Sequence, residues 1–276
     1  MIDRNHDLSL TRQASLLNIS RGTVYYLPRP VSPADLVLMR KIDELHLKHP
    51  FMGARMLRDQ LTRQGIHTGR RHIRTLMRCM GIEALAPQPG TSQAAPGHKI
   101  YPYLLRKLAI NRANQVWALD TTYIPMARGF VYLTAVVDVA SRRVLAHKVA
   151  ITLEAIHAKE VIEQAFARYG VPEIVNTDQG SQCTAEEFTD VVLAKGCKLP
   201  MDGRGAWRDN VFVERLWRSV KNERVYLKAY DGMSAARKDI ADYFDWYNVD
   251  RPHSKLDRLT PVEKYLAALP QLNKAA

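Results

Sequence analysis

The run Val116-Trp117-Ala118-Leu119-Asp120-Thr121-Thr122-Tyr123-Ile124 predicts a β-strand that carries a single acidic residue. Two further runs rich in Val, Tyr and Thr follow it after short turns, at 130–139 and 143–150. Because β-branched and aromatic residues favour strands and short turns favour antiparallel neighbours, the three runs predict an antiparallel meander.

Helix-like and strand-like patterns alternate after the meander. Helices are expected at about 153–169, 185–195 and 207–222, and strands at 173–178 and 197–200. This order, βββαβαβα, is that of the RNase H-like fold, so we predict an α/β domain with a mixed sheet. In that fold the first and fourth strands are neighbours, so acidic side chains near their ends converge.

Three carboxylates fall where this topology can bring them together. Asp120 lies in the first strand, Asp178 closes the fourth, and Glu214 stands in the last long helix. Mg²⁺ prefers carboxylate oxygens, and two such ions about 3.5–4 Å apart can drive displacement at a phosphodiester. We predict that these acids are catalytic and bind two Mg²⁺ ions, which Mn²⁺ can replace. Position alone does not single these three out, because the chain has 28 acidic residues and Asp138 of the second strand is an equally good candidate for the first acid.

The excess positive charge of the chain, +12 in all, lies almost entirely in its first part. Residues 1–115 hold 18 basic and 7 acidic residues, whereas residues 116–276 hold 22 and 21. This asymmetry is typical of a nucleic-acid-binding module joined to a different domain. A solvated basic face is the alternative interpretation.

Residues 10–27 have the spacing of a helix-turn-helix. Ala14 is small where two helices must cross, and Asn18 tolerates the left-handed conformation of the turn. Ile19 is expected in the small core, and Ser20 is expected to cap the second helix. The residues of that helix placed to contact DNA are Arg21, Thr23 and Tyr25. Two short helices that never meet DNA are the alternative.

A basic helix is predicted near residue 75. Ile73, Leu76 and Met77 fall at i, i+3 and i+4, so they should face a core. Four arginines are left largely outside, as in a recognition helix, and are predicted to contact DNA phosphates: Arg70, Arg71, Arg74 and Arg78.

Three prolines and two glycines interrupt any periodicity over residues 84–99, which is typical of a linker. The predicted domains are a helix-turn-helix at 1–30, a second such module at 31–83, a linker at 84–114, an RNase H-like catalytic core at 115–230 and a helical tail at 231–276.

The motifs around the acids resemble bacterial insertion-sequence transposases, which share a DDE triad with retroviral integrases, and more narrowly the OrfB part of the insertion-sequence-three family. They are Trp117-x-x-Asp120-Thr121-Thr122-Tyr123-Ile124, Thr177-Asp178-Gln179-Gly180-Ser181-Gln182, Gly205-x-x-x-Asp209-Asn210-x-x-x-Glu214, and Tyr247-Asn248-x-x-Arg251-Pro252-His253-Ser254-x-Leu256 with Thr260-Pro261. Thirty-five residues separate the second acid from the third, as in that family. The sequence departs from the family at Asn176, where His is frequent, and over 200–204.

The resemblance implies Mg²⁺-dependent cleavage at the end of an element, followed by attack of the freed 3′-OH on a phosphodiester. It implies double-stranded DNA partners, namely the terminal inverted repeats and the target, a homo-oligomer on paired ends, and an OrfA or OrfAB partner product.

Further DNA contacts are expected around the acids. Lys221 follows Glu214 by seven residues, so the two share a helical face, and the resembled enzymes contact DNA there. Gln179, Arg251 and His253 are also predicted to contact DNA, with core support as the alternative role of the last two. Asp209 and Asn210 are expected to cap the helix that carries Glu214.

The composition argues against other classes of protein. Cys79, Cys183 and Cys197 form no CxxC pair, which supports neither a disulfide framework nor zinc. No apolar h-region and no run of about 18 apolar residues is present, so we expect no membrane partner. The scattered cysteines fit a reducing, cytoplasmic setting, and the resemblance implies a bacterial, nucleoid-associated one. The rival functions are a non-catalytic DNA-binding regulator of transposition and an RNase H-type nuclease.

Overall fold

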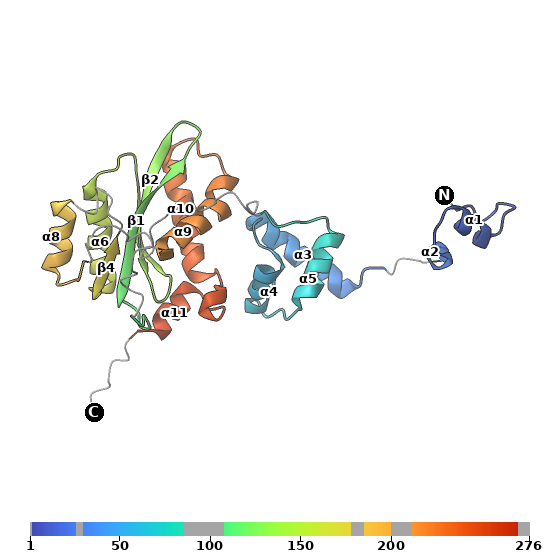
Figure 1. The fold of residues 1–276 in the computed structure, drawn as a ribbon, viewed down its shortest axis with the longest axis horizontal. Coiled ribbons are helices and arrows are strands. Elements are labelled where there is room, and N and C mark those ends of the chain that lie inside the picture. The colour runs from blue at the N-terminus through green and yellow to red at the C-terminus, as the bar shows by residue number, and fades with distance from the viewer. Residues whose placement is uncertain (1, 26–29, 86–107, 178–184, 200–210, 270–276) are drawn as a thin grey trace, which may run out of the picture. The chain divides into compact units, whose positions relative to one another are not determined.

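A computed structural model describes residues 2–25, 30–85, 108–177, 185–199 and 211–269 (Figure 1). The chain divides into two compact units, Met1–Asp43 and Glu44–Ala276. The five-part domain division made from the sequence stays a prediction.

The first unit contains the predicted helix-turn-helix. Its helices are α1 (Leu10–Leu16), α2 (Arg21–Tyr25) and the start of α3 (Pro33–Lys48). Asn18 has a φ of 52°, the left-handed conformation that the spacing predicts. The Oγ of Ser20 accepts a hydrogen bond from the backbone N–H of Thr23 at 3.2 Å, so Ser20 caps α2 as expected. Ala14 is buried, as the close helix crossing requires.

The expectation that Ile19 fills the core of this unit is wrong, because its side chain is 38% exposed. The physical reason is the size of the helices. α1 has seven residues and α2 has five, and α2 buries none of its side chains, so the pair encloses too little apolar surface to take up Ile19.

The second unit opens with the end of α3, followed by α4 (Ala54–Arg63) and α5 (Arg70–Cys79). Ile73, Leu76 and Met77 of α5 are buried, as their spacing predicts. The four arginines of the same helix are all exposed: Arg70, Arg71, Arg74 and Arg78. α5 therefore presents a basic face to solvent and an apolar face to its own core.

A four-stranded mixed sheet follows. Its strands are β1 (Val116–Pro125), β2 (Phe130–Asp138), β3 (Val144–Ala150) and β4 (Ile174–Thr177), in the order β3-β2-β1-β4. β1 pairs antiparallel with β2, with Asp120 opposite Ala135, and parallel with β4, with Leu119 opposite Thr177. The meander and the neighbouring first and fourth strands are confirmed. The strand expected at 197–200 is reduced to one bridge, between Lys198 and Ile174.

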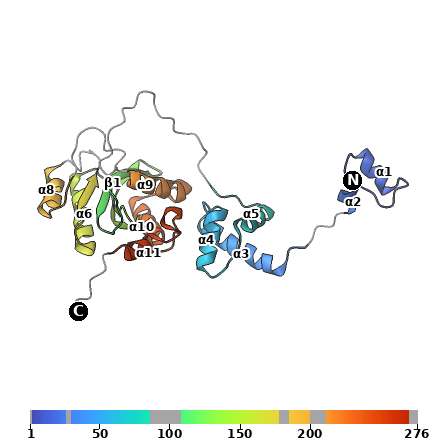
Figure 2. The ribbon, with the colours of Figure 1, turned by 60° about the horizontal axis from the view of Figure 1, so that its bottom comes forward.

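Helices cover both faces of the sheet (Figure 2). One face packs against α6 (Ala155–Tyr169) and α8 (Glu186–Ala194), and the other against α9 (Val211–Glu223) and α10 (Met233–Val249). The short helices η2 (Val225–Leu227), η3 (Ser254–Leu256) and α11 (Pro261–Ala267) complete the described chain. This is the α/β, RNase H-like arrangement predicted from the element order.

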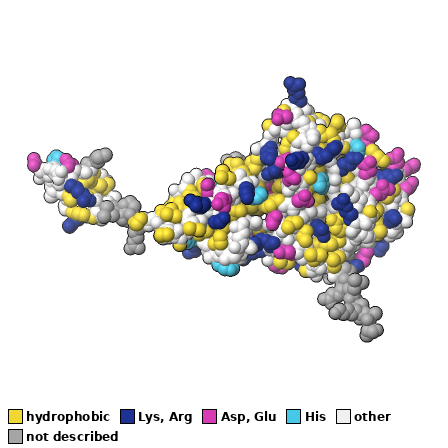
Figure 3. Space-filling view, turned by 180° about the vertical axis from the view of Figure 1, so that it is seen from behind, with side chains coloured by type: hydrophobic (Ala, Val, Ile, Leu, Met, Phe, Trp, Pro, Cys, Tyr) yellow, Lys and Arg dark blue, Asp and Glu magenta, His cyan; other side chains and the backbone are white. Residues whose placement is uncertain are grey.

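On the face drawn in Figure 3, basic and acidic side chains are interspersed over the larger unit. Over the described ranges, every helix is too short or too polar to cross a bilayer.

Asp138 has a structural environment that separates it from Asp120. Its side chain is fully buried, and its Oδ1 accepts from the N–H of Asn114 at 2.9 Å. Its Oδ2 accepts from the N–H of Ser141 at 2.8 Å and from the Ser141 hydroxyl at 2.6 Å. Burial raises the pKa of Asp138, while these hydrogen bonds act against the rise. Asp138 therefore shapes the turn between β2 and β3, where Arg142 has a φ of 66°.

We predict that Asp138→Ala lowers the free energy of unfolding by about 2–4 kcal/mol, because it leaves two buried donors of Ser141 and the partly buried N–H of Asn114 without an acceptor. Asp138→Asn should lose less, since the amide oxygen still accepts from one side. Urea denaturation followed by circular dichroism measures the change, with exposed Asp190→Ala of α8 as the control. Equal stability of the Asp138→Ala and Asp190→Ala proteins would contradict the structural role.

Candidate active site

Helix α9 is joined to strand β1 by a hydrogen bond between side chains. The indole Nε1 of Trp217 donates to Oδ2 of Asp120 at 2.8 Å. The other carboxylate oxygen, Oδ1, accepts from the backbone N–H of Thr121 at 2.7 Å. Trp217 is only 7% exposed and belongs to the hydrophobic core beside the sheet. A buried indole therefore fixes the orientation of the Asp120 carboxylate.

Glu214 and Lys221 share the face of α9 that Trp217 turns toward β1. The three residues stand at i, i+3 and i+7, positions that lie within about 60° of one another around a helix. Partial burial lowers the pKa of Lys221 and the carboxylate of Asp120 raises it, so the ammonium lies within electrostatic reach of that acid. The Lys221 Nζ also lies 4.4 Å from the centroid of the Tyr123 ring. Lys221 therefore lies near Asp120, and the helical spacing predicts that Glu214 shares its face of α9.

The donor set of this site fits a hard divalent cation. Asp120 and Glu214 supply carboxylate oxygens from two elements that the Trp217 hydrogen bond holds together. Partial burial raises the pKa of Glu214 because it disfavours the charged form of the carboxyl. Among the predicted site residues, Asp178, Gln179, Asp209 and Asn210 lie outside the described residues.

The motif at 247–256 anchors the far end of α9. Arg251 donates from Nε to Oε2 of Glu223 at 2.8 Å and from Nη2 to Oε1 at 2.5 Å. The hydroxyl of Tyr243 donates to the same carboxylate at 2.8 Å. His253 lies 3.1 Å from Nη1 of Arg251, and burial together with that guanidinium lowers its pKa to about 3. For Arg251 and His253 these contacts favour core support, the second of their two predicted roles.

A second ion-pair cluster anchors the residues just after Glu223. Arg224 donates from Nε to Oδ2 of Asp239 in α10 at 2.8 Å, and the Tyr230 hydroxyl donates to the same oxygen at 2.7 Å. Sequence reasoning missed Glu223 and Asp239, because no local pattern links either acid to a partner elsewhere in the chain. It also missed Trp217, although an aromatic residue between Glu214 and Lys221 on one helical face was a usable signal.

The upstream residues predicted to contact DNA are exposed. In α2 these are Arg21, Thr23 and Tyr25, with the Arg21 guanidinium 5.7 Å from the Tyr25 ring. The arginines of α5 are exposed in the second unit. Their contact with DNA stays a prediction.

Comparison with known families covers most of the chain. Two models described as integrase core domains match residues 110–205 and 195–261, and a model described as an HTH-like domain matches residues 33–90. The putative transposase InsK for insertion sequence element IS150 of Escherichia coli is 25% identical over 89% of this chain and 89% of its own length. The transposase for insertion sequence element IS904 of Lactococcus lactis is 28% identical over 83% of this chain and 94% of its own length. The catalytic core domain of HTLV-2 integrase, solved in complex with magnesium, is 20% identical, with a TM-score of 0.46 over 55% of this chain and 96% of that one.

We predict that Trp217→Phe weakens Mn²⁺ binding roughly tenfold, the scale for losing an outer partner of a metal ligand. The phenyl ring keeps most of the core packing, but it cannot donate to Asp120. Isothermal titration of Mn²⁺ measures the change, and Trp246→Phe in α10 is the matched control. Unchanged affinity in a folded Trp217→Phe protein would show that Asp120 needs no support from the indole.

Proposed function

Because this chain belongs to the insertion-sequence transposases that carry an integrase core domain, we propose that it cleaves and joins DNA strands in the transposition of a bacterial insertion sequence. The observation that carries the proposal is the hydrogen bond from Trp217 to Asp120. It holds the face of α9 that bears Glu214 and Lys221 against the strand that bears Asp120. Carboxylates and a lysine collected in this way suit chemistry at a phosphodiester.

In the proposed reaction, Asp120, Asp178 and Glu214 would hold two Mg²⁺ ions, which Mn²⁺ can replace. Such ions, when bound, supply activation of the attacking hydroxyl and stabilisation of the leaving oxygen. Trp217 and the Thr121 amide keep the Asp120 carboxylate in one orientation. No covalent protein nucleophile is required, because the attacking groups are water and then a DNA hydroxyl.

Two displacements make up the reaction. In the first, water attacks the phosphodiester at the element end, the bond to the 3′ oxygen breaks, and that oxygen leaves as a free 3′-OH. In the second, this 3′-OH attacks another phosphodiester, forms a new P–O bond and displaces the 3′ oxygen of the strand under attack. Lys221 would place its ammonium beside the phosphates during both steps, close to Asp120.

The partners of the proposed reaction are double-stranded DNA at the terminal inverted repeats and at the target. The match to an HTH-like domain and the exposed arginines of α5 support a DNA partner. A homo-oligomer on paired ends would bring two element ends together, and an OrfA or OrfAB product would add further DNA-binding surface.

We predict that Asp120→Asn, Asp178→Asn and Glu214→Gln each reduce strand transfer by at least about a thousandfold, since each removes a charged metal ligand. DNA affinity should stay within about twofold, because most excess charge lies upstream. A gel assay with Mg²⁺ and a duplex bearing the inverted repeats that flank the coding region measures both. Asp138→Asn is the control and should lose far less. Binding without cleavage by the wild-type chain would favour the regulator instead.

We predict that Lys221→Ala reduces strand transfer tenfold to a hundredfold while metal binding survives. The lost interaction is one charge-assisted phosphate contact, worth roughly 1.5–3 kcal/mol. Lys221→Arg should keep most activity, because a phosphate needs the positive charge more than one fixed geometry. Strand-transfer rates beside a Mn²⁺ titration separate the two effects. An alanine variant with wild-type rates would leave Lys221 as a surface residue without a role in the reaction.

A further inference from the structure

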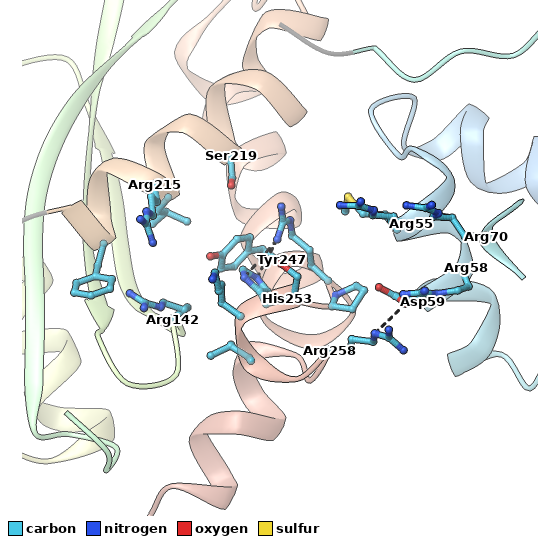
Figure 4. A pocket seen from close by; sticks show the side chains of 18 residues that line it. Arg55, Arg58, Asp59, Arg70, Arg142, Arg215, Ser219, Tyr247, His253 and Arg258 are labelled. Carbon is cyan, nitrogen blue, oxygen red and sulfur yellow. Dashed lines mark hydrogen bonds and ion pairs between the residues drawn. The ribbon is translucent and has the colours of Figure 1, made fainter. Parts of the chain in front are cut away.

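A basic cleft of about 650 Å³ lies beside α9, within the second unit (Figure 4). One wall comes from α9 and the turn after β2, and the other comes from α4 and the start of α5. The segment after α10 forms the floor. Of the residues that line it, eight are Lys or Arg and one is acidic: Arg55, Arg58, Arg70, Arg142, Arg215, Arg251, Lys255 and Arg258, with Asp59.

Four of these eight cations contact other side chains of the protein. Arg251 is paired with Glu223, and Arg58 and Arg258 lie 2.5 and 3.6 Å from Asp59. The Arg142 guanidinium lies 3.7 Å from the centroid of the Phe212 ring. Internal pairing therefore neutralises part of the lining only.

The other four cations of the cleft are exposed, and within the described ranges none of them forms an ion pair. They are Arg55, Arg70, Arg215 and Lys255. Figure 4 shows Arg215 on one side of the cleft and Arg55 and Arg70 on the other. Cations of one sign collected around a concave surface focus their field and raise the local concentration of anions.

Two contacts within the second unit hold the walls of the cleft together. The His49 ring stacks on Trp246 of α10 with centroids 4.4 Å apart. Arg63 of α4 donates to both carboxylate oxygens of Glu263 in α11, each at 3.0 Å. The cleft is therefore a built feature of this unit.

The helix ends on one wall add to the positive field. α4 and α5 begin after Gly53 and Gly69, neither of which provides a side-chain cap, and neither helix has an acid in its first turn. Both first turns carry Arg instead, in Arg55 and Arg70. Because a helix N-terminus is positive, these arginines repel it unless an anion lies nearby.

We propose that this cleft binds the sugar–phosphate backbone of one DNA strand on the flank of α9 away from the carboxylate site. The proposal rests on the proposed function and assigns part of its DNA path. Phe212, Arg215 and Ser219 of the cleft lie about 100–160° around α9 from Glu214, so the cleft opens on the flank of the helix away from the acids, facing the wall formed by α4 and α5. The major groove alone is about 12 Å wide, so a cavity of this size takes one backbone and cannot enclose a duplex.

Charge-pair variants of the full chain test the proposal. One pair, Arg215→Ala with Lys255→Ala, removes charge from the α9 side, and the other, Arg55→Ala with Arg70→Ala, from the helical wall. The matched control, Arg168→Ala with Lys195→Ala, removes two exposed cations at the ends of α6 and α8, which cover the other sheet face. Fluorescence anisotropy with a labelled 30-base-pair duplex, titrated with salt, gives the affinity and its salt dependence.

The slope of log K against log salt should become less negative by about two in each cleft pair. Each pair loses two phosphate contacts, and each contact contributes about −0.9 to the slope. At 0.1 M salt the affinity should fall roughly tenfold to a hundredfold, and the four-fold variant should lose about four from the slope. The control pair should keep the wild-type slope. All variants should keep the wild-type melting temperature, because the substituted side chains are exposed.

Wild-type slopes in both cleft pairs, or an equal loss in the control pair, would overturn the proposal. A second outcome would also overturn it. If polyglutamate displaced the duplex from the wild type as well as an oligonucleotide of the same charge does, and lost this effect in the cleft pairs, the cleft would be assigned to an acidic protein segment. The carboxylate variants separate this test from the proposed function. If the wild type transfers no strand but the slopes change as expected, the proposed function fails and the cleft assignment stands.

Discussion

The hydrogen bond between the Trp217 indole and Asp120 fixes the position of α9 against the sheet, and the rest of the site depends on that position. α9 buries Val213, Leu216 and Val220 against the sheet, and Trp217 stands at the edge of that apolar face. Burial of the indole would leave its N–H unsatisfied unless an acceptor lay at the sheet, and Asp120 is that acceptor. Core packing and alignment of the acids are thus achieved by the same side chain.

The C-terminal part of the chain holds the end of α9 in place. Glu223 and Arg224 at the end of α9 are held by Arg251 and Asp239, through hydrogen bonds of 2.5–2.8 Å. These residues come from α10 and the segment that follows it, which the sequence separates from the catalytic core as a tail. In the structure the tail belongs to the support of the site. The second integrase core model, which ends at residue 261, spans the same region.

Local patterns were enough to predict the four strands of the sheet, their order along the chain and the buried face of α5, because periodicity and β-branched residues act within a few neighbours. They also identified Asn18, whose left-handed turn depends on its own side chain. Ile19 was predicted wrongly, since its burial depends on how much surface two short helices enclose. The partners of Glu223 and Asp120 escaped prediction because they are set by packing between elements far apart in the sequence.

The ion pair between Glu223 and Arg251 restricts the tilt of α9 at its C-terminal end. Glu223 and Glu214 are nine residues apart, which along a helix is about 13 Å. A tilt of α9 by about 5° at Glu223 would move Glu214 by about 1 Å, and a misplacement of that size can reduce the rate about a hundredfold. The angular stiffness of a largely buried ion pair, remote from any reacting atom, therefore adds to the alignment that the Trp217 hydrogen bond gives the site.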